Sequence, residues 1–152
     1  MAKANYVKAA RKDYPVEGIS KGEPYWWWEI PFQPVRRSKT QPKASQLTSS
    51  DFLQQVYGLQ EDLEALTATA TKEDITSAIE DTVSQLNALA EEQESRRENI
   101  PEQLQDSGSG QLLQDRADKC REWADSLENI DTDVALEDLL EEVTSYSTYD
   151  GE

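Results

Sequence analysis

Apolar residues recur at helical spacing along most of the chain after residue 48. Positions three and four apart are apolar while the residues between them are polar or charged, which is the pattern of a helix with one buried face. A shorter segment, Val134–Val143, follows the same spacing. Because the apolar stripes are narrow, the pattern favours a mainly α protein built as an antiparallel coiled-coil helical bundle. The long stripes are Phe52, Val56, Leu59, Leu63 and Leu66; Ile75, Ile79, Val83, Leu86 and Ala90; and Leu112, Ala117, Cys120, Trp123, Leu127 and Ile130.

Local signals predict where these helices begin and end. Thr71 and Asp74 have the spacing of a capping box, so we expect a long helix from there to Glu98. Ser107–Gly110 alternates serine and glycine and predicts a flexible hinge. Residues 147–152 lack apolar periodicity and predict a frayed tail. The narrow stripes also leave open a homodimer in which two copies share one core.

The N-terminal third has a different pattern. Tyr25–Ile30 is an unbroken aromatic and β-favouring run, and Val35–Thr40 follows it after a turn with two prolines. This arrangement predicts a small N-terminal β-hairpin. Strand alternation places Trp26 and Trp28 on one face and Trp27 on the other. We expect the face with Trp26 and Trp28 to pack as a small core, whereas Trp27 is a candidate contact for a partner.

Charge divides the chain into two parts. Residues 1–48 carry nine Lys and Arg against four Asp and Glu, a net charge of +5, whereas residues 49–152 carry six against 27, a net charge of -21. The sequence therefore predicts a basic N-terminal module at 1–48, in which residues 2–13 form a short helix ahead of the hairpin. It predicts an acidic helical bundle at 49–146. An acidic surface of this kind repels nucleic acid and anionic lipid and attracts basic proteins.

The residue types remove the commonest catalytic sites from consideration. The chain has no histidine, so it has no Ser-His triad and no imidazole metal ligand. Its single cysteine, Cys120, falls on an apolar stripe and is expected to be a small buried residue. Asp131–Glu142 matches a calcium loop at its first, third and last positions, but Ala135 and Leu136 replace a ligand and the turn glycine. We therefore expect no enzyme activity, no cofactor and no metal site.

Two segments of the chain have a distinctive composition. The first has the sequence KGEPYWWWEIPF and is followed by RRSKTQPKASQLT; the second lies in the acidic half and has the sequence PEQLQDSGSGQLLQDRADKCREWADSLENID. With this aromatic–RSKT hairpin and helical C-terminal half, the chain resembles a group of small acidic phage and prophage proteins over about Asn5–Asp131. The resemblance implies a phage source. It transfers no activity and no functional residue.

Together, these observations support the hypothesis of a phage-type interaction or inhibitor protein without catalysis. Its acidic helices would bind a basic, nucleic-acid-handling host protein as a DNA mimic does, and the Trp/Arg hairpin would anchor the complex. The candidate partner-binding residues are Trp27, Arg36, Arg37, Lys39, Glu137, Asp138, Glu141 and Glu142.

Two alternatives stay open beside this hypothesis. The first is a nucleic-acid-binding module that uses the basic aromatic hairpin, because indole rings flanked by cations stack on bases. The second is a structural or assembly coiled coil. No apolar run approaches the roughly 18 residues of a membrane helix, and the first residues lack the apolar core of a signal peptide. We therefore expect no membrane association and a cytoplasmic location, which is the host cytoplasm for a phage protein.

Overall fold

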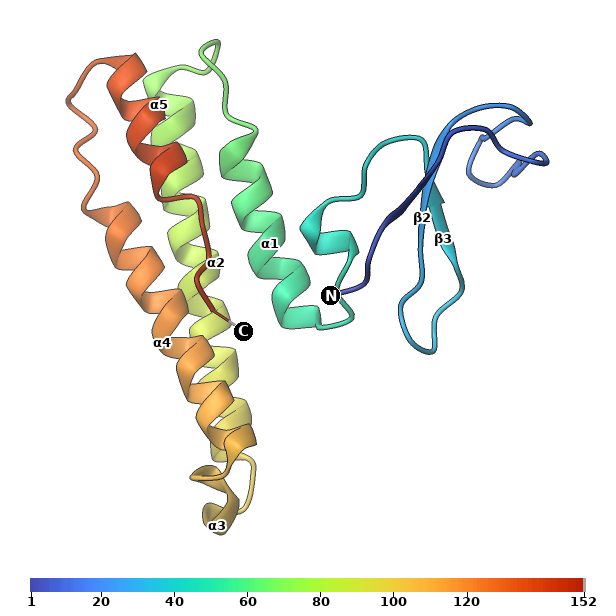
Figure 1. The fold of residues 1–152 in the computed structure, drawn as a ribbon. Helices are drawn as coiled ribbons and strands as arrows, with labels where there is room; N and C mark the ends of the chain where they lie inside the picture. The colour runs from blue at the N-terminus through green and yellow to red at the C-terminus, as the bar shows by residue number, and fades with distance from the viewer. Residues whose placement is uncertain (152) are drawn as a thin grey trace. The chain divides into compact units, whose positions relative to one another are not determined.

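The computed structural model describes residues 1–151 and divides the chain into two compact units (Figure 1). The first, Met1–Tyr57, contains the strands and is called the sheet unit; the second, Gly58–Glu152, is called the helical unit. The division falls inside a helix. The boundary predicted after residue 48 is therefore earlier than the observed one.

In the sheet unit, three short strands form one antiparallel sheet. They are β1 (Asn5–Val7), β2 (Tyr25–Trp28) and β3 (Arg36–Ser38), in the spatial order β1-β2-β3. Trp27 lies opposite Arg37, so the predicted pairing of the two runs is confirmed. A 3-10 turn follows β3 before the first helix begins.

The predicted helix over residues 2–13 is wrong, because this segment supplies β1. A two-stranded hairpin alone is marginally stable in water, and β1 pairs with the open edge of β2 and places Tyr6 opposite Trp26. This pairing outweighs the helix propensity of the alanines and lysines in the segment. The chain then makes a loop closed by a single bridge between Tyr14 and Ile19 before it returns as β2.

Most of the helix lies in the second half of the chain. The helices, with the 3-10 turn, make up 52% of the chain, which confirms a mainly α fold with a small antiparallel sheet. The capping box predicted at Thr71 is confirmed, since its side chain accepts from the amide of Asp74 and the Asp74 carboxylate accepts from the amide of Thr71. The helices are α1 (Asp51–Glu64), α2 (Lys72–Glu98), α3 (Glu102–Gln105), α4 (Gly108–Glu128) and α5 (Leu136–Ser145).

The long helices α2 and α4 run antiparallel and side by side, joined through the short α3 (Figure 1). Their apolar stripes are buried, and Arg121 on α4 makes a bidentate ion pair with Glu94 on α2. The hinge predicted at Ser107–Gly110 is wrong, because Gly108–Gly110 forms the first turn of α4. A side chain at Gly110 would overlap the backbone of Gln105, so glycine here permits a close approach rather than flexibility.

The C-terminal segment is packed rather than frayed over residues 147–151. Ser147 and Tyr149 are 1% and 7% exposed. The Trp123 indole donates to the carbonyl of Tyr146, and the rings of Trp123 and Tyr149 lie 6.4 Å apart between centroids. The amide of Tyr149 also donates to the side chain of Gln60 at 3.3 Å. The prediction of a frayed tail was wrong because two aromatic residues can anchor a segment that has no helical periodicity.

A buried glutamine side chain interrupts the apolar stripe of α2. Gln93 is 1% exposed, and its Oε1 atom has no hydrogen-bond partner. Since an unsatisfied buried acceptor is destabilising, replacing Gln93 by leucine is expected to raise the free energy of unfolding by about 1 kcal/mol. Chemical denaturation measures this change. Gln85→Leu, at an exposed position of the same helix, is the control and should change it little. A loss of stability in Gln93→Leu would contradict the prediction.

Candidate functional site

One face of the sheet is packed by its own loop. Ala10, Ile19 and Tyr25 are at most 8% exposed and form a small core. Trp27 is half-buried and packs against this core together with Tyr14. The loop between β1 and β2 therefore packs against part of Trp27, and the contact of Trp27 with a partner stays a prediction.

Arg37 lies on the same face and is held by its own unit. Its guanidinium sits 4.3 Å from the centroid of the Tyr14 ring and 3.4 Å from the carboxylate of Glu17. A hydrogen bond from the hydroxyl of Tyr25 lowers the pKa of Tyr14, with Arg37 contributing, and raises the pKa of Tyr25. Lys39, the next candidate cation, lies 3.3 Å from the carboxylate of Glu23. Two of the cations predicted to meet a partner thus have partners inside the sheet unit.

The opposite face of the sheet is half covered and half open. Trp28 is 3% exposed, and its indole N–H donates to the carbonyl of Gln46 at 3.0 Å. Trp26 is only half-buried and lies beside Tyr6, with ring centroids 5.1 Å apart and planes tilted by 50°. Tyr6 is 53% exposed. The open aromatic pair is therefore Tyr6 and Trp26. Tyr6 was missed because its segment was predicted to be helical.

The turn between β2 and β3 carries another aromatic side chain that sequence reasoning missed. Phe32 is fully exposed and has a φ of 64°. Arg36 is exposed beside it and donates to the side chain of Gln33 at 2.8 Å, and the amide of Gln33 donates to the carbonyl of Ile30. The signal available in the sequence was the aromatic residue between two turn prolines. Arg36 is the candidate cation that remains most open to a partner.

The four acidic candidates lie together on α5. Glu137, Asp138 and Glu141 are exposed and Glu142 is half-buried, while the opposite side of the helix is anchored by fully buried Leu139 and Val143. Glu137 and Asp138 occupy the first turn, where carboxylates stabilise the positive end of the helix dipole. Residues 122–152 contain eleven Asp and Glu and no Lys or Arg. The α5 carboxylates therefore have no cation nearby in sequence.

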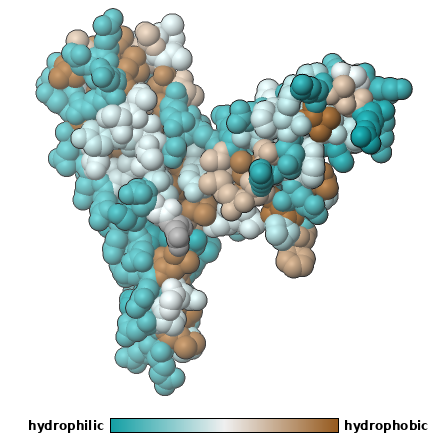
Figure 2. Space-filling view, viewed as in Figure 1, coloured by the Kyte–Doolittle hydropathy of each residue, from teal (hydrophilic) through white to brown (hydrophobic). Residues whose placement is uncertain are grey.

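Helix α4 carries a second row of carboxylates, with Arg116, Lys119 and Arg121 in the same stretch of the helix. Asp115, Asp118, Glu122 and Asp125 are all exposed and are spaced by three or four residues, which places them along one side of the helix. Figure 2 shows hydrophilic residues over much of the visible surface of the helical unit. No helix among residues 1–151 combines the length and apolarity that crossing a bilayer requires.

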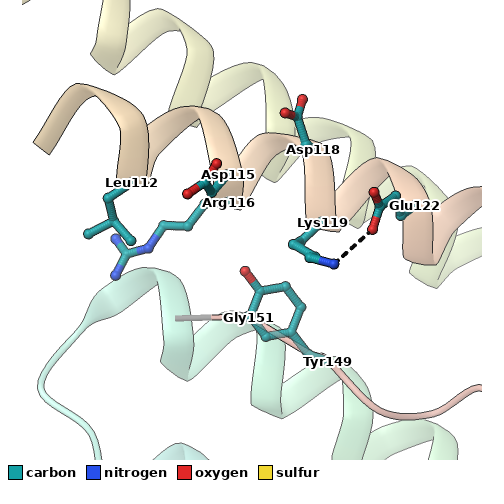
Figure 3. A pocket seen from close by; sticks show the side chains of 8 residues that line it. All are labelled: Leu112, Asp115, Arg116, Asp118, Lys119, Glu122, Tyr149 and Gly151. Carbon is teal, nitrogen blue, oxygen red and sulfur yellow. Dashed lines mark hydrogen bonds and ion pairs between the residues drawn. The ribbon is translucent and has the colours of Figure 1, made fainter. Parts of the chain in front are cut away.

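A pocket of about 370 Å³ lies between α4 and the C-terminal segment (Figure 3). Figure 3 shows the ring of Tyr149 directed toward α4, whose charged side chains line the pocket. The amine of Lys119 lies 3.1 Å from the carboxylate of Glu122, and this hydrogen bond raises the pKa of Lys119. The amine therefore stays protonated near neutral pH and is a poor nucleophile.

The thiol of Cys120 is also a poor nucleophile. Cys120 is fully buried, and burial raises the pKa of its thiol to about 12. Among the described residues 1–151, no three His, Cys, Asp or Glu side chains stand close enough to hold a metal ion. In the segment tested as a calcium loop, the carboxylate of Asp131 instead accepts from the amide of Asp133 at 2.9 Å.

The chain has no detected relatives. No protein-family model, curated protein or solved structure matches it.

The burial of Cys120 makes its reactivity a test of the packing of α4. Because the thiolate is the reacting species, native protein is expected to react with a thiol reagent at least about a hundredfold more slowly than denatured protein. Ellman's reagent, followed by absorbance with and without guanidinium chloride, measures both rates. Similar rates in the two conditions would show that α4 does not bury this face.

Proposed function

We propose that this protein is a non-enzymatic, phage-type inhibitor whose acidic helical unit binds the basic surface of a nucleic-acid-handling host protein. The helical unit would occupy a surface that otherwise meets phosphates. The observation that carries the proposal is the stretch of residues 122–152, which holds eleven Asp and Glu and no Lys or Arg and includes the exposed carboxylates of α5.

The distribution of charge between the two units supports this proposal. The helical unit holds six Lys and Arg against 26 Asp and Glu, a net charge of -20, while the sheet unit holds nine against five, a net charge of +4. Four of the six cations already pair with carboxylates of the same unit, so they are poorly placed to neutralise the rest. These pairs are Arg96–Glu92, Arg97–Asp106, Lys119–Glu122 and Arg121–Glu94.

The spacing of the carboxylates is suited to a partner that reads a charged backbone. The four α5 acids from Glu137 to Glu142 span about 8 Å of helix axis, or about one charge per 2.5 Å, and residues 122–152 contain no Lys or Arg to offset them. One strand of B-DNA carries a charge every 3.4 Å or so along its axis. This part of α5 therefore reaches the charge density of a single strand. Long-range attraction of this kind raises the rate at which the protein associates with a basic partner. Once bound, the helical unit would block the surface on which the partner binds nucleic acid.

Most of the sheet-unit residues predicted to anchor the partner already have contacts within that unit. Trp27 and Arg37 are engaged inside the sheet unit, and Lys39 is paired with Glu23. Arg36 remains exposed. An anchor on the sheet unit would therefore use Arg36 and the open aromatic side chains rather than Trp27.

A capture experiment with a charge-reversed control tests this function. The whole protein is immobilised and exposed to bacterial lysate with and without nuclease, beside a variant in which the four α5 acids are lysines. We expect a basic nucleic-acid-handling protein to be retained after nuclease treatment and to be lost with the variant. Loss of the captured protein after nuclease treatment would contradict the proposal. Retention of the same proteins by the wild type and by the lysine variant would also contradict it.

A second candidate function is supported by the Tyr6–Trp26 pair. These rings are accessible on a unit of net charge +4, and aromatic side chains near cations stack on single-stranded nucleic acid. Direct binding of bare single-stranded DNA or RNA at physiological salt, abolished by Tyr6→Ala with Trp26→Ala, would favour this candidate over the first.

We further propose that α2 and α4 pack as a coiled-coil pair and that the protein acts in the host cytoplasm.

A further inference from the structure

The tip of the β2–β3 turn presents a strained and fully exposed aromatic residue. Phe32 is 108% exposed, more than in an extended chain, and its φ of 64° lies in the left-handed region that bulky L-residues seldom adopt. Pro31 precedes it and the amide of Gln33 closes the turn on Ile30, which matches a type II turn. Glycine or asparagine normally occupies this position. Keeping phenylalanine there is unfavourable in the isolated protein and suggests a contact.

The charges beside this tip indicate what kind of surface it meets. Glu29 precedes the turn and Arg36 follows it, and both are exposed. One carboxylate and one guanidinium give the tip no net charge, so it is not attracted to a polyanion such as nucleic acid or an anionic bilayer. An aromatic side chain next to an arginine is instead the composition of a protein–protein anchor, which inserts into an apolar pocket with an acidic rim.

The helical unit contains a groove with these properties. It has a volume of about 410 Å³ and lies between the first half of α2 and the end of α4. Ile79, Val83, Leu127 and Ile130 form its apolar lining, and the exposed acids Glu80 and Glu128 border it. The size falls in the range of pockets that bind small ligands and single aromatic side chains.

We propose that the Phe32 tip of one copy docks into this groove of a second copy. Phe32 would fill the apolar part, and Arg36 would pair with Glu80 and Glu128. The charges are complementary, because the tip carries the exposed Arg36 and the groove is bordered by Glu80 and Glu128. Two such contacts made reciprocally close into a dimer, whereas one contact repeated in the same sense extends a chain of copies. The contact leaves the α5 carboxylates free and adds self-association to the proposed function, but it competes with the host protein for Arg36 and Phe32. Because it is small, we expect a dissociation constant on the order of 0.1 mM.

Sedimentation velocity of the whole protein over a wide concentration range tests this contact. The wild type is expected to increase in average mass with concentration. Phe32→Asn should weaken association at least about tenfold, and asparagine tolerates a positive φ, so the turn is kept. Leu104→Asn, at an exposed apolar position on α3, is the matched control and should associate like the wild type. Circular dichroism confirms that each variant is folded.

A charge exchange locates the groove. Arg36→Glu alone should weaken association, and adding Glu80→Lys with Glu128→Lys should restore it. A wild type that stays monomeric throughout would overturn the proposal, as would equal association of Phe32→Asn. Failure of the exchange to restore association would place the tip elsewhere and also overturn it. If the protein is monomeric and Phe32→Asn instead loses a captured protein, the tip docks on that protein, not on a second copy.

Discussion

Replacing Trp28 by alanine is expected to unfold the sheet unit while α2 and α4 keep their structure. Trp28 is 3% exposed, so its removal costs about 3–5 kcal/mol. It also leaves the carbonyl of Gln46 without its donor, which adds about 1 kcal/mol. A unit of this size has a total stability of only a few kcal/mol. Near-ultraviolet circular dichroism and amide NMR signals of residues 5–38 measure the loss.

The adjacent tryptophan provides the matched control. Trp26 is half-buried beside the exposed Tyr6, so Trp26→Ala should cost roughly 1 kcal/mol and leave the sheet folded. Equal destabilisation by the two variants would mean that the covered and open parts of this sheet face have been assigned wrongly. A Trp28→Ala variant with an intact sheet spectrum would contradict the central role of its indole.

Reversing the four α5 acids to lysine is expected to slow association with the captured partner by roughly 10- to 1,000-fold. The change adds eight units of positive charge within residues 122–152, which otherwise contain no Lys or Arg. Most of the loss should lie in the association rate, because exposed charges steer encounter more than they hold a complex. The rate should also become less sensitive to salt. Stopped-flow or surface plasmon resonance measurements over a series of salt concentrations provide both quantities.

A second reversal separates position from total charge. Four other exposed acids can be changed to lysine to give the same net charge; they are Glu64, Glu73, Asp81 and Glu98. If association falls equally in both variants, total charge rather than the α5 surface governs binding. Replacing the α5 acids by glutamine and asparagine checks that lysines in the first turn have not unfolded the helix.

The helices were predictable from the sequence because each depends on local signals. The capping box of Thr71 and the apolar stripe that follows it set the start and the buried face of α2 without reference to the rest of the fold. The hinge prediction at Ser107–Gly110 was wrong because a glycine needed for close approach to Gln105 looks the same in the sequence as a glycine in a flexible linker. The tail misled because its order comes from contacts with Trp123 and Gln60, which are distant in sequence.

The candidate site was less predictable than the helices. Strand alternation placed Trp27 and Trp28 on opposite faces correctly, but it does not reveal which face a loop will cover. The loop from β1 to β2 determined this, and β1 itself was predicted to be helix. The α5 acids needed no such information, because a helix with Leu139 and Val143 buried must direct Glu137 and Glu141 toward solvent.

The suppressed thiol has a consequence for proton exchange. The chain contains no histidine, and burial holds the pKa of Cys120 at about 12. Carboxyl groups ordinarily titrate near pH 4, and lysine and tyrosine near pH 10. No side-chain type in the chain therefore ordinarily changes its protonation between about pH 6 and 8.5. A change in affinity with pH there, or a buffer-dependent heat in calorimetry, would report a terminal α-amino group or the ionisation of the partner's groups.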